Sequence, residues 1–302
     1  VIVMEQTEHW GGRAPVDGGM VDGTPVDKFV DQTVAELEAM DNVTLRNRCM
    51  GAGVYDHGYV LGYERLTDHA PQKSGPRHRL WRIRAGHVIT ATGAIERPLS
   101  FAGNDIPGVM LAAAVRDYVV NWGVSIGDRT VVVTNNDDAY RTALALKDAG
   151  LEVPVILDAR PLGGGPLMEA CKAKGIRVEV GKAIAKVKGG KRVEGVVVCA
   201  QVGEGAMVEE IACDAVLMSG GWTPSLHLFS HTKGSLIWDE ENNVFLPGDK
   251  TEKCHIAGAG RGLWGSQACV DDGVTAAADA LKSLGHKTAK ATFTVNADRT
   301  GT

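Results

Sequence analysis

The sequence lacks cysteine pairs at the spacing of a redox or metal-binding motif. A Cys-x-x-Cys pair is the usual basis of a redox dithiol, a zinc site or an iron–sulfur cluster. We therefore expect small, buried, apolar cysteines in a reducing cytoplasm, and no disulfide reductase chemistry. The six cysteines are Cys49, Cys171, Cys199, Cys213, Cys254 and Cys269.

Long apolar runs, a signal peptide and a basic stripe are also absent. No run approaches the roughly 18 apolar residues that span a bilayer. The formal net charge is −5 and the basic residues are scattered. We therefore predict a cytoplasmic protein with neither membrane nor nucleic acid as a partner.

No constellation of catalytic or metal-binding side chains stands out. His227 and His231 have i, i+4 spacing, but apolar residues surround them and no third ligand is evident. No Ser-His-Asp or Cys-His order is apparent. We assign no catalytic residue and no metal ligand.

The chain contains no intact G-x-G-x-x-G dinucleotide fingerprint. It opens instead on a strand-like segment that ends in the carboxylate of Glu5, followed by Gly11 and Gly12. In a dinucleotide-binding βαβ unit the glycine turn comes first, and the ribose-binding acid follows about 20 residues later. We therefore expect a fragment that carries the second half of such a unit without its first.

What is present indicates an α/β protein of about two domains. The 302 residues are 44% hydrophobic and include 38 glycines, which allows a large core and many turns. A helix is predicted over 25–40, and half-exposed antiparallel strands over 54–65 and 79–84. A buried strand over 87–94 ends in small residues.

Two nucleotide-binding modules follow from this pattern. A second βαβ unit runs from a strand at 130–134 through a turn at 135–140, and from Cys254 the order is strand, glycine-rich turn and helix. We predict two Rossmann-like three-layer domains, the second inserted in the first. The first is placed at 1–116 and 235–285, the second at 117–234, and a linker at 286–302.

The first module has three features that should meet around one dinucleotide. A carboxylate at a strand end can accept hydrogen bonds from the adenosine ribose and disfavours the 2′-phosphate of NADP. The glycine turn near Gly258 precedes a helix whose positive dipole end can face a diphosphate. The alternatives are a solvent-facing glutamate and a plain strand-to-helix connection. The predicted cofactor-binding residues are Glu5, Gly11, Gly12, Ala91, Thr92, Gly93, Gly258, Ala259 and Gly260.

The second module has a phosphate turn that disfavours anions. Asp137 places a carboxylate where the pyrophosphate sits, and Tyr140 places a large ring at the third glycine position. Like charges about 4 Å apart repel by about 1 kcal/mol in water and by more near a protein surface. We predict a retained fold without a nucleotide, with Asp158 no longer a ribose contact. The alternative is that this module binds some different ligand.

The sequence from Glu5 to Gly285 resembles the alpha subunit of heterotetrameric sarcosine oxidase in five segments. The turn at 135–140 is the most specific part. The resemblance implies an enzyme that oxidises sarcosine to glycine with oxygen, yielding peroxide and a one-carbon unit for tetrahydrofolate. The matching segments are 89–99, 101–110, 135–140, 219–224 and 227–230.

The resemblance also implies cofactors and partners. In that family the alpha subunit holds NAD, the beta subunit carries the substrate-oxidising FAD, FMN lies at their contact, and gamma and delta subunits complete the enzyme. Flavin-binding relatives usually have Asp after the glycine that corresponds to Gly258, where this chain has Ala259. The chain departs from the family in lacking the phosphate turn before Val1 and the folate-binding domain after about Gly285.

Three alternatives stay open. One is a subunit of a related amine, opine or proline dehydrogenase or of a cyanide-forming oxidase. Another is an FAD-dependent pyridine nucleotide reductase, which would need two intact phosphate turns. The third is an assembly scaffold without a nucleotide.

Overall fold

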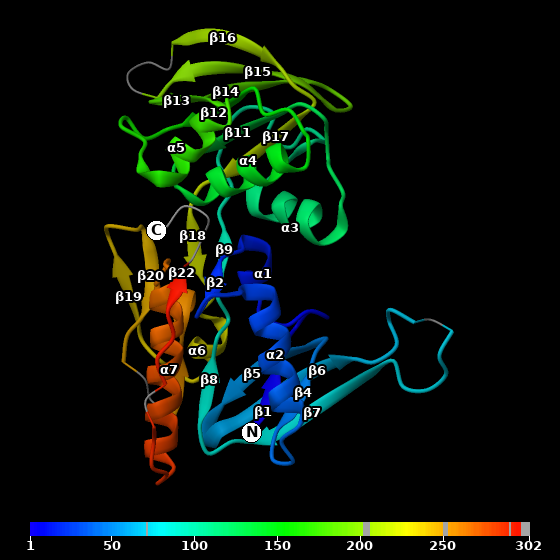
Figure 1. Cartoon of the computed structure of the whole chain (residues 1–302), viewed down its shortest axis with the longest axis vertical. Coiled ribbons are helices and arrows are strands. Elements are labelled where there is room, and N and C mark those ends of the chain that lie inside the picture. The colour runs from blue at the N-terminus through cyan, green and yellow to red at the C-terminus, as the bar shows by residue number, and fades with distance from the viewer. Residues whose placement is uncertain (71, 202–205, 250–252, 290, 297–302) are drawn as a thin grey trace. The chain divides into compact units, whose positions relative to one another are not determined.

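A computed structural model describes the chain except for residues 71, 202–205, 250–252, 290 and 297–302 (Figure 1). The chain forms two units: unit 1 comprises Val1–Ile95 and Thr223–Thr302, and unit 2 comprises Glu96–Trp222. It enters unit 2 along β9 (Ala94–Glu96) and leaves along β18 (Trp222–Pro224).

These divisions differ from the predicted boundaries at 116/117 and 234/235. Strand β10 (Val109–Leu111) lies in unit 2 because it pairs in parallel with β17 (Ala215–Ser219). At the other boundary, α6 (His227–His231) lies in unit 1, because Phe229 is buried with Leu226 and Ile256.

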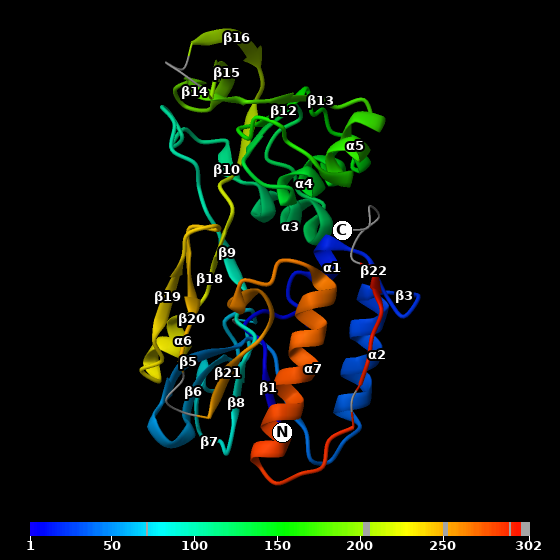
Figure 2. The ribbon, with the colours of Figure 1, turned by 90° about the vertical axis from the view of Figure 1, so that its left-hand side faces the viewer.

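Unit 1 contains two pairs of short parallel strands. Strand β1 (Ile2–Met4) pairs with β4 (Thr44–Arg46), and β8 (Val88–Thr90) pairs with β21 (Cys254–Ile256). Helices α2 (Val26–Glu38) and α7 (Ser266–Ser283) lie on one side of these strands (Figure 2). A short helix, α1 (Ala14–Asp17), precedes α2.

An antiparallel meander of three strands also belongs to unit 1. The strand predicted at 54–65 is divided, because η1 (Asp56–Gly58) turns the chain and its His57 has a left-handed φ of 61°. The meander comprises β5 (Cys49–Tyr55), β6 (Tyr59–Arg65) and β7 (His78–Arg84).

Part of the predicted linker at 286–302 is a strand. Strand β22 (Val295–Asn296) pairs with β2 (Met20–Val21), which pairs in turn with β3 (Thr24–Pro25). The ring of Phe293 meets Phe29 edge-on at a centroid distance of 5.8 Å. These contacts attach the segment just before residue 297 to the start of unit 1.

Unit 2 is a parallel sheet covered on both faces. Helices cover one face and an antiparallel three-stranded meander packs on the other, so β11 (Thr130–Thr134) is buried along its whole length. A strand buried on both faces is apolar throughout, which accounts for its valine run. The sheet order is β10-β17-β11-β12-β13, with β12 at Val155–Asp158 and β13 at Arg177–Val180. The helices are α3 (Ala112–Trp122), α4 (Asp138–Asp148) and α5 (Gly165–Ala173), and the meander is β14 (Lys182–Gly189), β15 (Val193–Ala200) and β16 (Met207–Ala212).

Candidate nucleotide-binding sites

Two of the predicted segments of the first module meet in unit 1. The pair β8–β21 continues one residue past the strands, where the Ala257 N–H donates to the Thr90 carbonyl at 3.0 Å. A Cβ on Gly260 would lie 2.6 Å from Ile256 Cγ2, 3.6 Å from Thr92 Oγ1 and 3.7 Å from the Gly93 carbonyl oxygen. The structure thus brings Ala91, Thr92 and Gly93 next to Gly258, Ala259 and Gly260.

Ser225 holds the Thr92–Gly93 turn in place. The Ser225 N–H donates to the Gly93 carbonyl at 2.9 Å, and Thr92 Oγ1 donates to the Ser225 carbonyl at 2.8 Å. Gly93 has φ +65°, with no atom within 4 Å of where its Cβ would be. Glycine suits this position because a larger residue would be strained there and would close the space beyond the strand. No sequence pattern points to Ser225, which lies 133 residues from Thr92.

One backbone donor of the glycine turn is already used within the protein. The Gly258 N–H donates to Asp272 Oδ2 at 2.8 Å, and Arg261 pairs with the other oxygen of the same carboxylate. A 3-10 turn, η2 (Gly258–Arg261), separates the glycines from the start of α7 at Ser266. The positive end of α7 therefore lies several residues past the turn, and Asp272 takes the place of an anion at Gly258.

Glu5 lies just past the end of β1 with an ordered side chain. Its backbone pairs with both neighbouring segments, since its N–H donates to Arg46 and its carbonyl accepts from Cys49, both at 2.8 Å. Its Oε1 accepts from the Thr7 N–H at 2.8 Å and from Thr7 Oγ1 at 3.0 Å. Thr7, which sequence analysis did not single out, thus fixes the direction of the carboxylate.

Gly11 and Gly12 follow in a turn with left-handed backbone. A Cβ on Gly11 would lie 2.8 Å from Val30 Cγ2, so the turn packs directly on α2. Gly12 has φ +58° with open space around it. In both views β1 and β8 end toward the same edge of unit 1 (Figure 1, Figure 2). Ligands of open parallel sheets bind at this edge.

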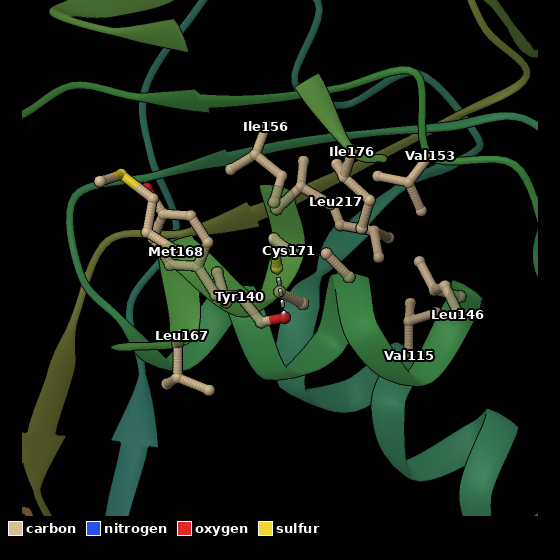
Figure 3. Close-up of a cluster of buried hydrophobic side chains, with 14 residues drawn as sticks. Val115, Tyr140, Leu146, Val153, Ile156, Leu167, Met168, Cys171, Ile176 and Leu217 are labelled. Carbon is tan, nitrogen blue, oxygen red and sulfur yellow. Dashed lines mark hydrogen bonds between the residues drawn. The ribbon is translucent and has the colours of Figure 1, made fainter. Parts of the chain in front are cut away.

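In unit 2 the turn predicted to reject nucleotides is filled by the protein's own side chains. Tyr140 is fully buried in the helix-side core, where Figure 3 shows it between Met168 and Cys171. Its Oη donates to Asp158 Oδ2 at 2.7 Å. Burial, followed by the hydrogen bond to Asp158, raises the pKa of the Tyr140 hydroxyl. The ring and its partner occupy the third-glycine position and the ribose-acid position of a working site.

Arg160 links the two carboxylates of this turn. Its Nη2 donates to Asp158 Oδ2 at 2.7 Å and to Asp137 Oδ1 at 2.6 Å. The Asp158 side chain is 0% exposed, whereas that of Asp137 is 43% exposed. The hydrogen bond to Asp158, and then that to Asp137, raises the pKa of Arg160. One guanidinium thus pairs with two carboxylates. The cluster of Arg160, Asp137 and Asp158 therefore keeps a net negative charge, which disfavours a phosphate.

A second polar cluster surrounds the start of α3. The Glu96 carboxylate is 6% exposed and accepts from the Ala113 N–H at 2.8 Å. Nη2 of Arg116 donates to both carboxylate oxygens of Asp138, at 3.0 and 2.9 Å. Burial raises the pKa of Glu96, partly offset by hydrogen bonds from Ser219 and Ala113. Glu96 therefore accepts a backbone N–H at the start of α3, and Asp138 connects α4 to Arg116 of α3.

The six cysteines are free thiols. No disulfide joins any of the six, and five are buried. Burial raises the pKa of Cys171 to about 12, and of Cys49 and Cys213 to about 11. Thiols with such pKa values stay protonated and poorly nucleophilic near neutral pH.

The described part of the chain holds neither a metal-ligand cluster nor a membrane span. No group of three or more His, Cys, Asp or Glu residues there could hold a metal ion. His231, one of the two histidines singled out, stacks on Tyr55 at a centroid distance of 5.6 Å. None of the helices in that part is both long and apolar enough to cross a membrane.

Comparison by sequence identifies relatives along almost the whole chain, although no family model matches it. The chain is 36% identical to the alpha subunit of the sarcosine oxidase of Corynebacterium sp. (strain P-1) over 292 residues. The match covers 94% of this chain and 30% of that relative. An opine oxidase subunit of Agrobacterium tumefaciens (strain Ach5) is 29% identical, over 85% of this chain and 55% of its own.

Comparison with solved structures finds the same fold in two enzymes of low sequence identity. The L-proline dehydrogenase of P. horikoshii superimposes with a TM-score of 0.70 at 20% identity, covering 96% of this chain and 52% of the other. The thioredoxin reductase of T. acidophilum gives a TM-score of 0.65 at 15% identity, covering 94% and 89%. These likenesses confirm the predicted α/β fold class.

Proposed function

We propose that this chain, a homologue of the sarcosine oxidase alpha subunits, is the NAD-binding part of such a protein. The chain spans about a third of the length of those relatives. The parent enzyme would oxidise sarcosine to glycine, with peroxide and a one-carbon unit for tetrahydrofolate as the other products. We assign no catalytic acid, base or nucleophile to this chain.

One observation carries the proposal of a dinucleotide in unit 1. The Thr92–Gly93 turn and the Gly258–Gly260 turn lie next to each other at the carboxyl ends of β8 and β21, and the space beyond Gly93 is open. Dinucleotides of open parallel sheets bind at such an edge. The Gly258 N–H, which donates to Asp272, is not offered to the diphosphate. In unit 2 the corresponding positions are taken by Tyr140, Asp158 and Arg160. A cavity of about 280 Å³ lies beside them, lined among others by Asn135, Ala159 and Arg160, so unit 2 could hold a ligand other than a dinucleotide.

Side chains of the site favour NAD over two related cofactors. The Glu5 carboxylate, oriented by Thr7, suits ribose hydroxyls and would repel the 2′-phosphate of NADP. Ala259 lacks the carboxylate that a flavin ribitol would use, which speaks against FAD. When bound, NAD would supply a hydride acceptor, but we propose that its role here is structural. Glu5, Gly11, Gly12, Ala91, Thr92, Gly93, Gly258, Ala259 and Gly260 would hold it.

The relatives are named as subunits, which supports a multisubunit enzyme. We propose beta, gamma and delta subunits as partners in a cytoplasmic heterotetramer. The beta subunit would hold the FAD that oxidises the amine, and this chain would form one wall of an FMN site at the contact between them.

A second candidate function is supported by the opine oxidase relative. Its 29% identity over 85% of this chain indicates that a subunit of a related amine, opine or proline dehydrogenase fits the same fold. The two candidates differ in the substrate of another subunit, and not in the site of unit 1.

The cofactor is tested by denaturing the complete parent chain and identifying the released compound by mass. NAD alone supports the proposal. FAD would instead support a flavin reductase, and the absence of any nucleotide would support an assembly scaffold.

The role of Glu5 is tested by Glu5→Gln in the same parent chain. Loss of charged hydrogen bonds to the ribose should weaken NAD binding by about 10- to 100-fold. It should also reduce the preference of the site for NAD over NADP. Glu8→Gln is the matched control, because Glu8 is a nearby carboxylate that faces Arg48 at 3.6 Å. Equal losses in both variants, measured by calorimetric titration, would contradict the assignment.

A further inference from the structure

A hairpin of unit 1 carries apolar side chains on both of its faces. It consists of β19 (Leu236–Asp239) and β20 (Val244–Pro247), paired antiparallel. Residues directly opposite each other in such a pair share a face. Trp238 therefore shares one face with Phe245, as Leu236 does with Pro247. We call this set of four residues the outer face.

The other face of the hairpin packs on unit 1 through Val244 and Leu246, whereas Ile237 on the same face is 58% exposed. Val244, on this face, is 2% exposed. Leu246 follows at the same side, and its Cδ2 lies 2.7 Å from where a Cβ on Gly262 would be. The hairpin thus covers the glycine turn after β21 with one face and leaves its other face outward.

The outer face is apolar although it is exposed. Leu236 is 41% exposed, Trp238 43% and Phe245 50%. The two rings meet edge-on at a centroid distance of 5.1 Å. An antiparallel pair with one face in water normally alternates apolar with polar residues. Contiguous exposed apolar side chains, two of them aromatic, are typical of a protein contact.

Carboxylates gather at the tip of the hairpin. Residues 236–247 include Asp239, Glu240 and Glu241 and no Lys, Arg or His, whereas Lys233 and Lys250 flank the hairpin in the sequence. Glu240 and Glu241 are exposed at the hairpin tip. A partner that buries the apolar strip must place its rim beside these charges, so Lys and Arg at that rim would be favoured.

We propose that the outer face of the β19–β20 hairpin is a docking surface for another protein subunit of the assembly. That subunit presents an apolar patch bordered by Lys and Arg. The inference rests on the proposed function only for the existence of partner subunits, and not on nucleotide binding.

A photo-cross-linking experiment in the native complex tests the surface. Benzoylphenylalanine replaces Phe245 in the full-length protein expressed in its own cells, and the cross-linked peptides of the purified complex are identified by mass. Benzoylphenylalanine at Leu80 is the matched control, because Leu80 is a 57% exposed apolar residue on β7 of the same unit. Cross-links from position 245 alone should fall on one co-purifying subunit, in an apolar segment within a few residues of Lys or Arg.

Three results would overturn the docking surface. Cross-links from position 245 only to the same polypeptide, whether to unit 2 or to the remainder of the parent chain, would make it an internal contact, and cross-links to a second copy would make it a self-association face. Equal yields from both positions would show unspecific proximity. Cofactor content measured on the same complex keeps this outcome separate from that of the NAD proposal.

The charge complementarity is tested by the double variant Glu240→Lys/Glu241→Lys. At moderate salt, retention of the partner subunit should fall by at least about 10-fold relative to the parent, as expected when like charges face each other at an interface rim. Glu36→Lys/Glu38→Lys on α2 makes the same charge change at exposed positions elsewhere in unit 1. Equal retention in the two double variants would refute the role of the acidic tip.

Discussion

At the scale of single residues, the turn after β11 shows how a nucleotide site can be filled from within. Asp137 was expected to repel a phosphate by its own charge. In the structure Arg160 pairs with it, but the same guanidinium also pairs with the buried Asp158. The turn therefore combines occupied space with a net negative charge, which is a stronger obstacle to a diphosphate than one carboxylate.

Replacing Arg160 should destabilise unit 2 strongly. Arg160→Gln leaves the fully buried Asp158 without its cation, at a cost of about 3 kcal/mol, the lower end for a broken buried pair. Asp137→Asn removes the half-exposed pair of the same guanidinium and should cost less than about 1 kcal/mol. Urea unfolding followed by circular dichroism measures both. Similar losses in the free energy of unfolding for the two variants would show that the ion pair of Arg160 with Asp158 does not stabilise unit 2 more than the pair with Asp137.

Glu96 should make the stability of unit 2 depend on pH. Its pKa in the folded state is raised by burial above the ordinary value of 4.5. The folded protein then binds a proton that the unfolded chain has lost, so stability falls as pH rises from about 4.5 through the raised pKa. Glu96→Gln cannot titrate. The melting temperature of the variant minus that of the parent should therefore increase across that range, and a constant difference would contradict this.

At the scale of elements, the segment from β21 to α7 contains glycines of opposite kinds. Gly260 is enclosed, since a Cβ would lie 2.6 Å from Cγ2 of Ile256, a stiff β-branched residue that is 5% exposed. Gly273 lies inside α7 with nothing within 4 Å of its Cβ position. The first is required by packing and the second is not.

Alanine at these two positions should have opposite effects on the free energy of unfolding. Gly273→Ala should stabilise by about 0.5–1 kcal/mol, because alanine loses less backbone entropy in a helix. Gly260→Ala should destabilise by about 1–3 kcal/mol through overpacking. Thermal and urea unfolding measure both. If NAD binds where we propose, the Gly260 variant should also bind it more weakly, whereas the Gly273 variant should not.

At the scale of the whole molecule, the two units have separate cores. The buried clusters of unit 2 contain residues of that unit alone, and those of unit 1 likewise. Units with their own cores open independently to a first approximation. Damage in one unit should therefore be detectable separately from ligand binding in the other.

Hydrogen exchange should separate the two units. Arg160→Gln should accelerate amide exchange in β11 and β12 and leave β5 and β6 unchanged. NAD should slow exchange next to β8 and β21 of the parent chain and leave the turn at 135–140 unchanged. Protection at that turn by NAD, and not beside Glu5, would reverse our assignment of the two modules.

Local pattern by itself determined the fold class and predicted a contrast between the modules. The apolar run at 130–134 predicts a strand of a βαβ unit, and the residues Asp137, Tyr140 and Ala259 depart from a dinucleotide fingerprint by their chemistry alone. Alternation and turn residues are properties of neighbours along the chain, so they are visible without a structure.

Only the tertiary structure decided which polar groups are already engaged in hydrogen bonds within the protein. Asp272 occupies the Gly258 N–H from 14 residues away, Arg160 reaches Asp137 across 23, and Ser225 holds Thr92 across 133. The tertiary structure also pairs β22, predicted as linker, with β2. It leaves one apolar face of the β19–β20 hairpin exposed. Such pairings depend on the distance in space between groups on different elements, which no periodicity along the chain encodes.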